Sequence, residues 1–129
     1  MLDTNVLIWW TTAPEKLSKK ARNILEKQTE EEEVLVSSIS ILEVYILVKK
    51  NKLKLLIDTD VWLEKLDNLP YIKFAPIDNK IAARSVKLTG LDEADPADRI
   101  IVATAQQYGA TLITSDKKIL DYKQVQTIW

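Results

Sequence analysis

A chain of 129 residues with 47% hydrophobic and 29% charged residues has the size and composition of one folded globular domain. Its net charge of -1 argues against binding nucleic acid through a broadly basic surface, because that mode depends on neutralising phosphates with Lys and Arg. The absence of Cys and His excludes disulfides, thiol nucleophiles, imidazole bases and nearly all zinc sites. With only two glycines, the chain cannot form a Gly-rich phosphate loop either.

The sequence contains no apolar segment long enough to span a bilayer. The longest apolar tract, residues 39–48, is short and is interrupted by Ser40 and Glu43. No signal-peptide pattern opens the chain, and no linker or low-complexity segment divides it. We therefore expect a single domain over residues 1–129 that works in the cytoplasm without a membrane partner.

Short apolar runs alternate with segments of helical periodicity. Apolar runs rich in β-branched residues are typical of buried parallel strands, and Ser or Asp caps mark several helix starts. The alternation predicts an α/β fold with three α/β/α layers and a central parallel sheet of about four to five strands. The expected elements are a strand stub at residues 2–3, a polar turn and short helix through 10, a helix over 18–27, an acidic loop over 29–33, a strand over 34–36, a helix over 39–50, a helix from 58 or 59 to before Pro70, a strand over 72–75, helices over 78–88 and 96–108, a strand over 111–113, a helical turn over 117–120 and a strand over 125–128.

The segment from Ala94 to Ala105 predicts a buried helix that opens with two acids. Asp95 followed by Pro96 is typical of a helix start, since the Asx side chain caps an N–H and Pro at the first position loses no needed donor. The residues that follow are apolar nearly all round, so other elements must cover this helix. For Asp95, capping alone and a role in a site are both open interpretations. Asp98, however, leads into a covered helix and needs a reason to carry charge there.

Three further acids follow predicted strands. Asp3 and Asp116 come directly after the first and fourth strands, and Glu43 lies one turn into the helix after the second; a capping box with Ser40 is the structural alternative for Glu43. The carboxyl ends of parallel strands meet at one edge of a sheet, where the helix start with Asp98 also lies.

Acids that converge in this way raise one another's pKa unless positive charge is supplied. Mg²⁺ or Mn²⁺, which bind oxygen ligands, would supply that charge. Such an ion would also polarise a phosphate oxygen and activate water without an imidazole. The pattern therefore favours metal-dependent phosphate-ester hydrolysis.

Four segments together resemble PIN-domain proteins, in particular the VapC-type toxins of bacterial toxin–antitoxin pairs: residues 2–9, 37–48, 95–105 and 111–116. The resemblance covers essentially the whole chain. It implies a Mg²⁺/Mn²⁺-dependent endoribonuclease, commonly a homodimer, that is silenced by an antitoxin protein whose C-terminal segment wraps the toxin. By this resemblance the catalytic and metal-binding acids are Asp3, Glu43, Asp98 and Asp116, with Asp95 as an accessory acid, Thr4, Asn5, Thr114 and Ser115 orienting ligands or waters, and Arg99 and Lys117 as contacts to substrate phosphate.

The chain departs from the family pattern at two places. Only Met1 and Leu2 precede Asp3, where relatives usually carry several apolar residues, so the sequence leaves the length of the first strand open. The segment before Asp95, residues 90–94, also lacks the His that many relatives have there. That His is therefore not expected to take part in metal chemistry.

Three other interpretations remain open. An aspartyl-phosphate phosphatase built on Asp3 would need a second acid two residues later, where Asn5 stands. A non-catalytic interaction module, with acids that only cap helices, predicts no Mn²⁺ binding. A PIN-type nuclease with a housekeeping role in RNA processing shares the predicted chemistry but not the antitoxin. Any exposed member of Trp9, Trp10 and Trp62 is a candidate for the dimer surface.

Overall fold

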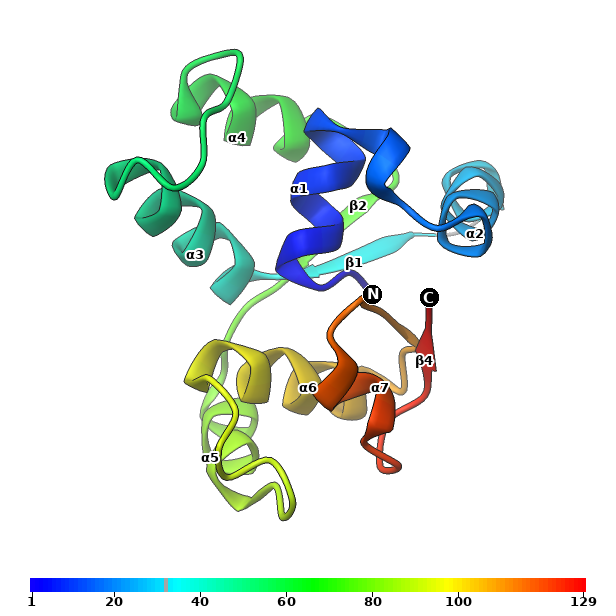
Figure 1. Cartoon of the computed structure of the whole chain (residues 1–129), viewed down its shortest axis with the longest axis vertical. Helices are drawn as coiled ribbons and strands as arrows, with labels where there is room; N and C mark the ends of the chain where they lie inside the picture. The colour runs from blue at the N-terminus through cyan, green and yellow to red at the C-terminus, as the bar shows by residue number, and fades with distance from the viewer. Residues whose placement is uncertain (32) are drawn as a thin grey trace.

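The computed structural model describes residues 1–31 and 33–129. Helices and short parallel strands alternate along the chain, which confirms the predicted α/β class (Figure 1). The elements are α1 (Thr4–Thr12), the 3-10 helix η1 (Pro14–Lys16), α2 (Lys19–Glu31), β1 (Val34–Ser37), α3 (Ser38–Lys49), α4 (Thr59–Asp67), β2 (Ile72–Ala75), α5 (Asn79–Lys87), α6 (Pro96–Tyr108), β3 (Leu112–Ile113), α7 (Lys117–Asp121) and β4 (Thr127–Ile128).

Among the described residues, the strands form two parallel pairs, β1 with β2 and β3 with β4. Leu2 lies between the pairs and bridges to both Val36 and Ile113 in parallel orientation. Its N–H donates to the carbonyl of Leu35 at 2.9 Å, and the N–H of Asp3 donates to the carbonyl of Ile113 at 3.0 Å. The expected strand stub is therefore a single bridging residue that joins the two pairs, and the pairs do not by themselves confirm the predicted central sheet of four to five strands.

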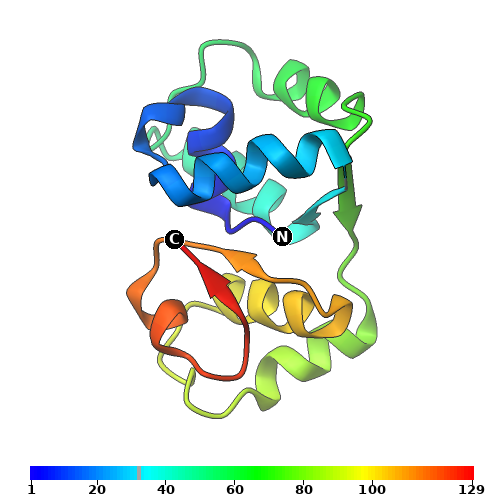
Figure 2. The same ribbon diagram turned by 90° about the vertical axis from the view of Figure 1, so that its right-hand side faces the viewer.

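Helices cover both faces of these strands. Residues that are adjacent along a strand belong to two different apolar clusters, one on each face. Met1 belongs to an apolar cluster with residues of α5, α6 and α7, whereas Leu2 belongs to a second cluster with residues of α1, α2 and α4. Leu112 and Ile113 divide between the clusters in the same way, because successive side chains of a strand point to opposite faces. Figures 1 and 2 show α1–α4 on one side of the N-terminal residues and α5–α7 on the other.

Local sequence chemistry accounts for most helix starts. The side chains of Asp58, Asp78 and Asp95 each accept a hydrogen bond from a backbone N–H in the first turn of α4, α5 and α6, as predicted. At the other end of α6, Gly109 adopts a left-handed φ of 60°, a conformation in which glycine avoids the strain of a side chain.

Several expected boundaries are wrong. The polar turn before the first helix is absent, because α1 begins at Thr4. Helix α2 continues to Glu31, since Glu, Gln and Lys are good helix formers, so residues 29–31 are not a loop, and residue 32 lies outside the described part of the chain. β3 and β4 are shorter than predicted. Trp62 is buried and Trp9 and Trp10 are half-buried, so none of them forms a freely exposed surface.

Helix α6 is the central support of one half of the molecule. It packs against α5 and α3, and residues 101–105 are all buried. This confirms that other elements cover the apolar helix. Among the described residues, no helix has the length and apolar character needed to cross a membrane.

Replacing Ile101 by Ala should lower the free energy of unfolding by about 3 kcal/mol, because a fully buried aliphatic side chain leaves a cavity. Urea unfolding followed by circular dichroism measures this change. Val86→Ala on α5 is the matched control, with an expected effect under about 0.5 kcal/mol, because Val86 is 72% exposed. Similar losses in the two variants would contradict the described core.

Candidate functional site

Asp3 is the buried centre of the predicted site. Its side chain is 4% exposed and lies at the junction of the two strand pairs. The hydroxyl of Thr114, directly after β3, donates a hydrogen bond to the Asp3 carboxylate at 2.6 Å. Burial raises the pKa of Asp3, and the bonds from Thr114 and from the N–H groups of Thr4 and Asn5 oppose that rise. The hydrogen bond thus joins Asp3, which follows the bridging residue Leu2, to Thr114, which follows β3.

Asp3 occupies the N-cap position of α1 but forms no regular capping hydrogen bond. The N–H groups of Thr4 and Asn5 lower its pKa, but burial has the larger effect and raises it. Capping is therefore not a sufficient reason for a buried acid at this position.

Glu43 on α3 is half-buried and is held by the first turn of α1. The Thr4 hydroxyl donates to the Glu43 carboxylate at 2.5 Å, and the Thr4 and Ser40 hydroxyls share a hydrogen bond at 2.9 Å. Burial raises the pKa of Glu43; the Thr4 bond lowers it, and the charges of Asp3 and Asp95 raise it further. The fully buried Ser40 was not among the predicted site residues, although its place three residues before Glu43 is a visible signal.

The capping-box alternative for Glu43 is wrong. The N-cap of α3 is Ser37, whose hydroxyl accepts a hydrogen bond from the N–H of Ile39 at 3.4 Å. Ser40 already lies within the helix, so Glu43 cannot serve as the third residue after a Ser40 cap. Glu43 is instead directed to Thr4 and the neighbouring acids.

Asp98 is the most perturbed of these acids. Burial raises its pKa to about 7, with further contributions from the charges of Asp3, Asp116, Glu43 and Asp95. All five predicted acids are thus near enough to interact. Among the described residues, no Lys or Arg is among the groups that set the pKa of Asp98 or Glu43.

Asp95 and Asp116 serve a structural role as well. The Asp95 carboxylate accepts from the N–H of Ala97 at 3.1 Å at the start of α6. The Asp116 carboxylate accepts from the N–H groups of Lys118 and Ile119 at 2.7 and 3.3 Å at the start of α7. The capping interpretation therefore describes these two residues correctly, and their charges still reach Asp98.

The acids do not form a ready set of metal ligands in their present rotamers. Among the described residues, no group of three acids is arranged so that it could hold an ion. The donor set nevertheless fits Mg²⁺ or Mn²⁺ chemically, because it consists of carboxylate oxygens without a compensating cation.

The remaining predicted residues lie around the acids in different states. Ser115 is half-buried, while Asn5 and Lys117 are exposed. Arg99 is half-buried, and its buried Nε has no hydrogen-bond partner among the described residues. The structure therefore leaves a donor of Arg99 unsatisfied, one residue after Asp98.

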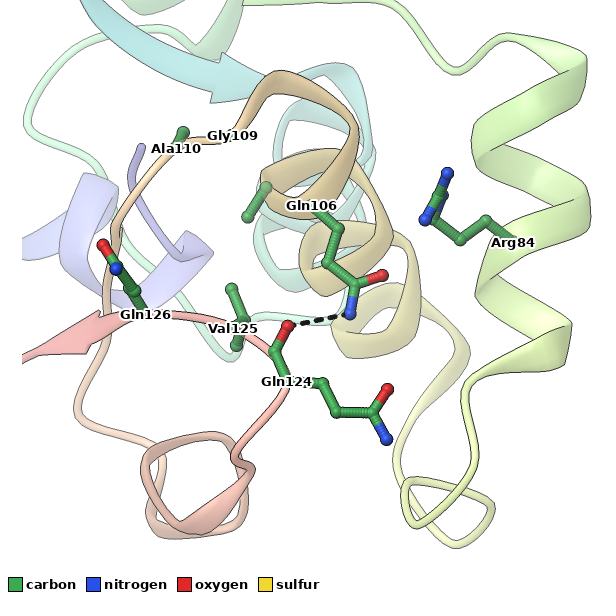
Figure 3. A pocket seen from close by; sticks show the side chains of 8 residues that line it. Arg84, Gln106, Gly109, Ala110, Gln124, Val125 and Gln126 are labelled. Atoms are coloured by element: carbon green, nitrogen blue, oxygen red, sulfur yellow. Dashed lines mark hydrogen bonds between the residues drawn. The ribbon is translucent and has the colours of Figure 1, made fainter.

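A cleft of about 530 Å³ lies at the other end of α6, away from Asp98 (Figure 3). Its walls include Arg84 of α5 and Gln106 of α6, and the Gln106 side chain donates to the carbonyl of Gln124 at 3.0 Å. No carboxylate lines this cleft. It is therefore distinct from the predicted acid site.

Comparison with known proteins finds a matching family, a related protein and solved structures of similar fold. The PIN domain pattern matches residues 1–125. Ribonuclease VapC22 of Mycobacterium tuberculosis (strain ATCC 25618 / H37Rv) is 31% identical over 131 residues, which cover 100% of this chain and 97% of that protein.

Two solved structures show a similar fold. One is the crystal structure of VapBC2 from Rickettsia felis bound to a promoter DNA fragment. It aligns with a TM-score of 0.73 and 23% sequence identity, and the alignment covers 100% of this chain and 97% of that chain. A toxin–antitoxin complex from Klebsiella pneumoniae aligns with a TM-score of 0.67 and 25% identity over 99% and 94% of the two chains. The resemblance predicted from the four sequence segments is thereby confirmed.

Replacing Asp98 by Asn should stabilise the metal-free protein at pH 8. Because the pKa of Asp98 is raised on folding, ionisation opposes folding as the pH rises from about 4 to about 7, and the amide removes that penalty. After allowance for solvent screening at a half-buried group, we expect a gain of about 1–2 kcal/mol at pH 8 that vanishes near pH 4.

Urea unfolding in the presence of a chelator measures this difference. Asp67→Asn, at an exposed residue that ends α4, is the control and should show no comparable gain. An Asp98→Asn variant less stable than wild type at pH 8 would mean that the acids do not repel one another as described.

Proposed function

The chain belongs to the PIN domain family, and we propose that it is a Mg²⁺- or Mn²⁺-dependent endoribonuclease that hydrolyses RNA phosphodiester bonds as the toxin of a toxin–antitoxin pair. The observation that carries this proposal is the gathering of four other acids around the half-buried Asp98, with no Lys or Arg of the described residues among the groups that set its raised pKa. Similarity to a relative named as a ribonuclease supports the choice of RNA as substrate.

Asp3, Glu43, Asp98 and Asp116 are the residues we assign to the ion, with Asp95 as an accessory acid. When bound, the ion would polarise a phosphate oxygen and lower the pKa of a water molecule. Ionised carboxylates are the form that binds metal, so the affinity should rise as Asp98 loses its proton near pH 7.

Neighbouring side chains position these acids. Thr114 holds the Asp3 carboxylate and Thr4 holds that of Glu43, which fixes their orientation toward the site. We assign Asn5 and Ser115 to the orientation of ligands or waters, and Arg99 and Lys117 to substrate phosphate. The unsatisfied Nε of Arg99 supports its assignment, because guanidinium N–H groups match phosphate oxygens.

We propose that the protein binds a cognate antitoxin and forms a homodimer. The similarity to a chain of a toxin–antitoxin complex supports a cognate antitoxin as partner. We further propose a cytoplasmic homodimer whose subunit is a single PIN domain over residues 1–129. The parallel bridges of Leu2 to both strand pairs support a central sheet of four to five strands, in which residues 1–3 take the middle position.

Asp98→Asn should reduce Mn²⁺-dependent cleavage of RNA at least 100-fold while the fold is retained, because the amide removes charge but little volume. Gel analysis of labelled RNA with purified protein measures cleavage, and circular dichroism checks folding. Asp67→Asn should cleave as wild type does.

Undiminished cleavage by folded Asp98→Asn would rule out the assigned site. Inducible expression of wild type and Asp98→Asn in a bacterium, with sequencing of new RNA ends, extends the test to cells. Growth arrest and new ends with wild type alone would support a toxin, and cleavage without arrest would favour a housekeeping nuclease.

Thr114→Val should weaken Mn²⁺ binding by about 10- to 100-fold. Valine keeps the shape of the buried threonine but removes the hydrogen bond that favours the ionised form of Asp3. Isothermal titration calorimetry measures the affinity. Thr111→Val, which removes an exposed hydrogen bond to Gln126, is the control, and equal affinities of the two variants would argue against this role of Thr114.

A further inference from the structure

A groove of about 500 Å³ runs along one face of α1. Its opposite wall consists of Leu47, near the end of α3, and of residues in the segment 52–56. The α1 wall is formed by residues spaced three and four apart, which share one helix face: Asn5, Ile8, Trp9 and Thr12. We call this feature the α1 groove.

One end of the α1 groove lies directly beside the acid site. Asn5 lines the groove, and its backbone N–H is one of the groups that lower the pKa of Asp3. The preceding residue, Thr4, donates its hydroxyl hydrogen bond to Glu43. A chain molecule with one unit at the acids can therefore place adjoining units along α1.

The charges in the α1 groove are opposite to those of the acid site. Lys16, Lys52 and Lys54 line it, and no Asp or Glu does. Within residues 1–31 and 33–129, none of these lysines forms an ion pair with a carboxylate. A net charge of -1 for the whole chain thus conceals a local cationic groove that suits a polyanion.

Trp9 adds an aromatic surface to the same groove. Its ring is half-buried and lies 5.7 Å from the ring of Trp129 between centroids, with an interplanar angle of 51°. This contact restrains the Trp9 side chain, so little conformational entropy is lost when a ligand binds it. Aromatic rings interspersed with cations are typical of proteins that bind single-stranded nucleic acid, since any base can stack on the ring.

We propose that the α1 groove binds a single-stranded segment of RNA beside the scissile phosphate, with a base stacked on Trp9 and phosphates contacted by Lys52 and Lys54. This inference rests on the proposed ribonuclease function and specifies its substrate as unpaired RNA. Paired bases are stacked on their neighbours and cannot meet the Trp9 ring. A second cleft of about 440 Å³, which we call the α5–α6 cleft, also has cations in Lys80, Arg84 and Lys87, but none of the described residues that line it is aromatic.

The test measures binding separately from cleavage. Fluorescence anisotropy of a labelled single-stranded RNA is recorded with the Asp98→Asn protein in a chelator, at several salt concentrations. Adding Lys52→Gln and Lys54→Gln should weaken binding about tenfold and reduce the log–log salt slope by about 1.4, the loss of two phosphate contacts. The matched control, Lys80→Gln with Lys87→Gln, removes the same charge from the α5–α6 cleft and should change affinity less than about twofold.

A second pair of variants tests stacking. Trp9→Leu should lose about tenfold in affinity, whereas Trp9→Phe should lose less than about threefold, because phenylalanine retains an aromatic face. A duplex of the same sequence should be insensitive to both.

Equal weakening by the two lysine pairs, or no weakening by Lys52→Gln with Lys54→Gln, would overturn the inference and leave the α1 groove to a protein partner. Cleavage by the wild-type protein is measured independently. If wild type cleaves RNA but the α1 groove variants bind and cleave equally well, only the groove assignment fails; if wild type cleaves nothing, the proposed function fails.

Discussion

Repulsion between carboxylates that the fold forces together is the constraint on which this structure depends. Asp3 is fixed by the bridge between the strand pairs, and Asp98 by the first turn of the buried helix α6. Neither residue can move away without disturbing the core on its side. Burial raises the pKa of Asp98, and the repulsion of the neighbouring acids raises it further. The apolar helix α6 begins next to the polar acid site because its packing holds Asp98 in place there.

Residues of the same type differ here through their surroundings. Asp95 and Asp116 lower the cost of their charge by capping helices, whereas Asp98 and Glu43 are partly buried and their pKa values rise. Threonine hydroxyls moderate the effect at Asp3 and Glu43. The acid site is thus a graded set of carboxylates, with Asp98 the one whose charge is least compensated. An ion would have its greatest effect on the protonation of that residue.

The sequence predicted the features that depend on local chemistry or on general rules of topology. The helix starts at Asp58, Asp78 and Asp95 were predicted correctly. The rule that the carboxyl ends of parallel strands meet at one edge of a sheet correctly predicted that the acids lie close together. The prediction from sequence failed where several residues could cap the same helix. Ser37, and not Ser40, is the N-cap of the helix that carries Glu43. The rotamers of the acids and the α1 groove depend on packing between distant segments, which no local pattern records. Trp9 in particular sits in an apolar run, and the sequence named it only as a candidate for the dimer surface, not as part of a groove.

The position of the first residues between the two strand pairs has a consequence for synthesis of the chain. The amino group of Met1 donates to the carbonyl of Thr111, and Asp3 accepts from Thr114, contacts that span 110 and 111 residues. A nascent chain that ends before β3 has no partner for one side of Leu2 and no hydroxyl for Asp3. Asp3 therefore reaches its final environment only when residues 111–114 are also in place. The acid site thus depends on pairing between segments that lie far apart in the sequence, and a chain that stops before β3 cannot complete it.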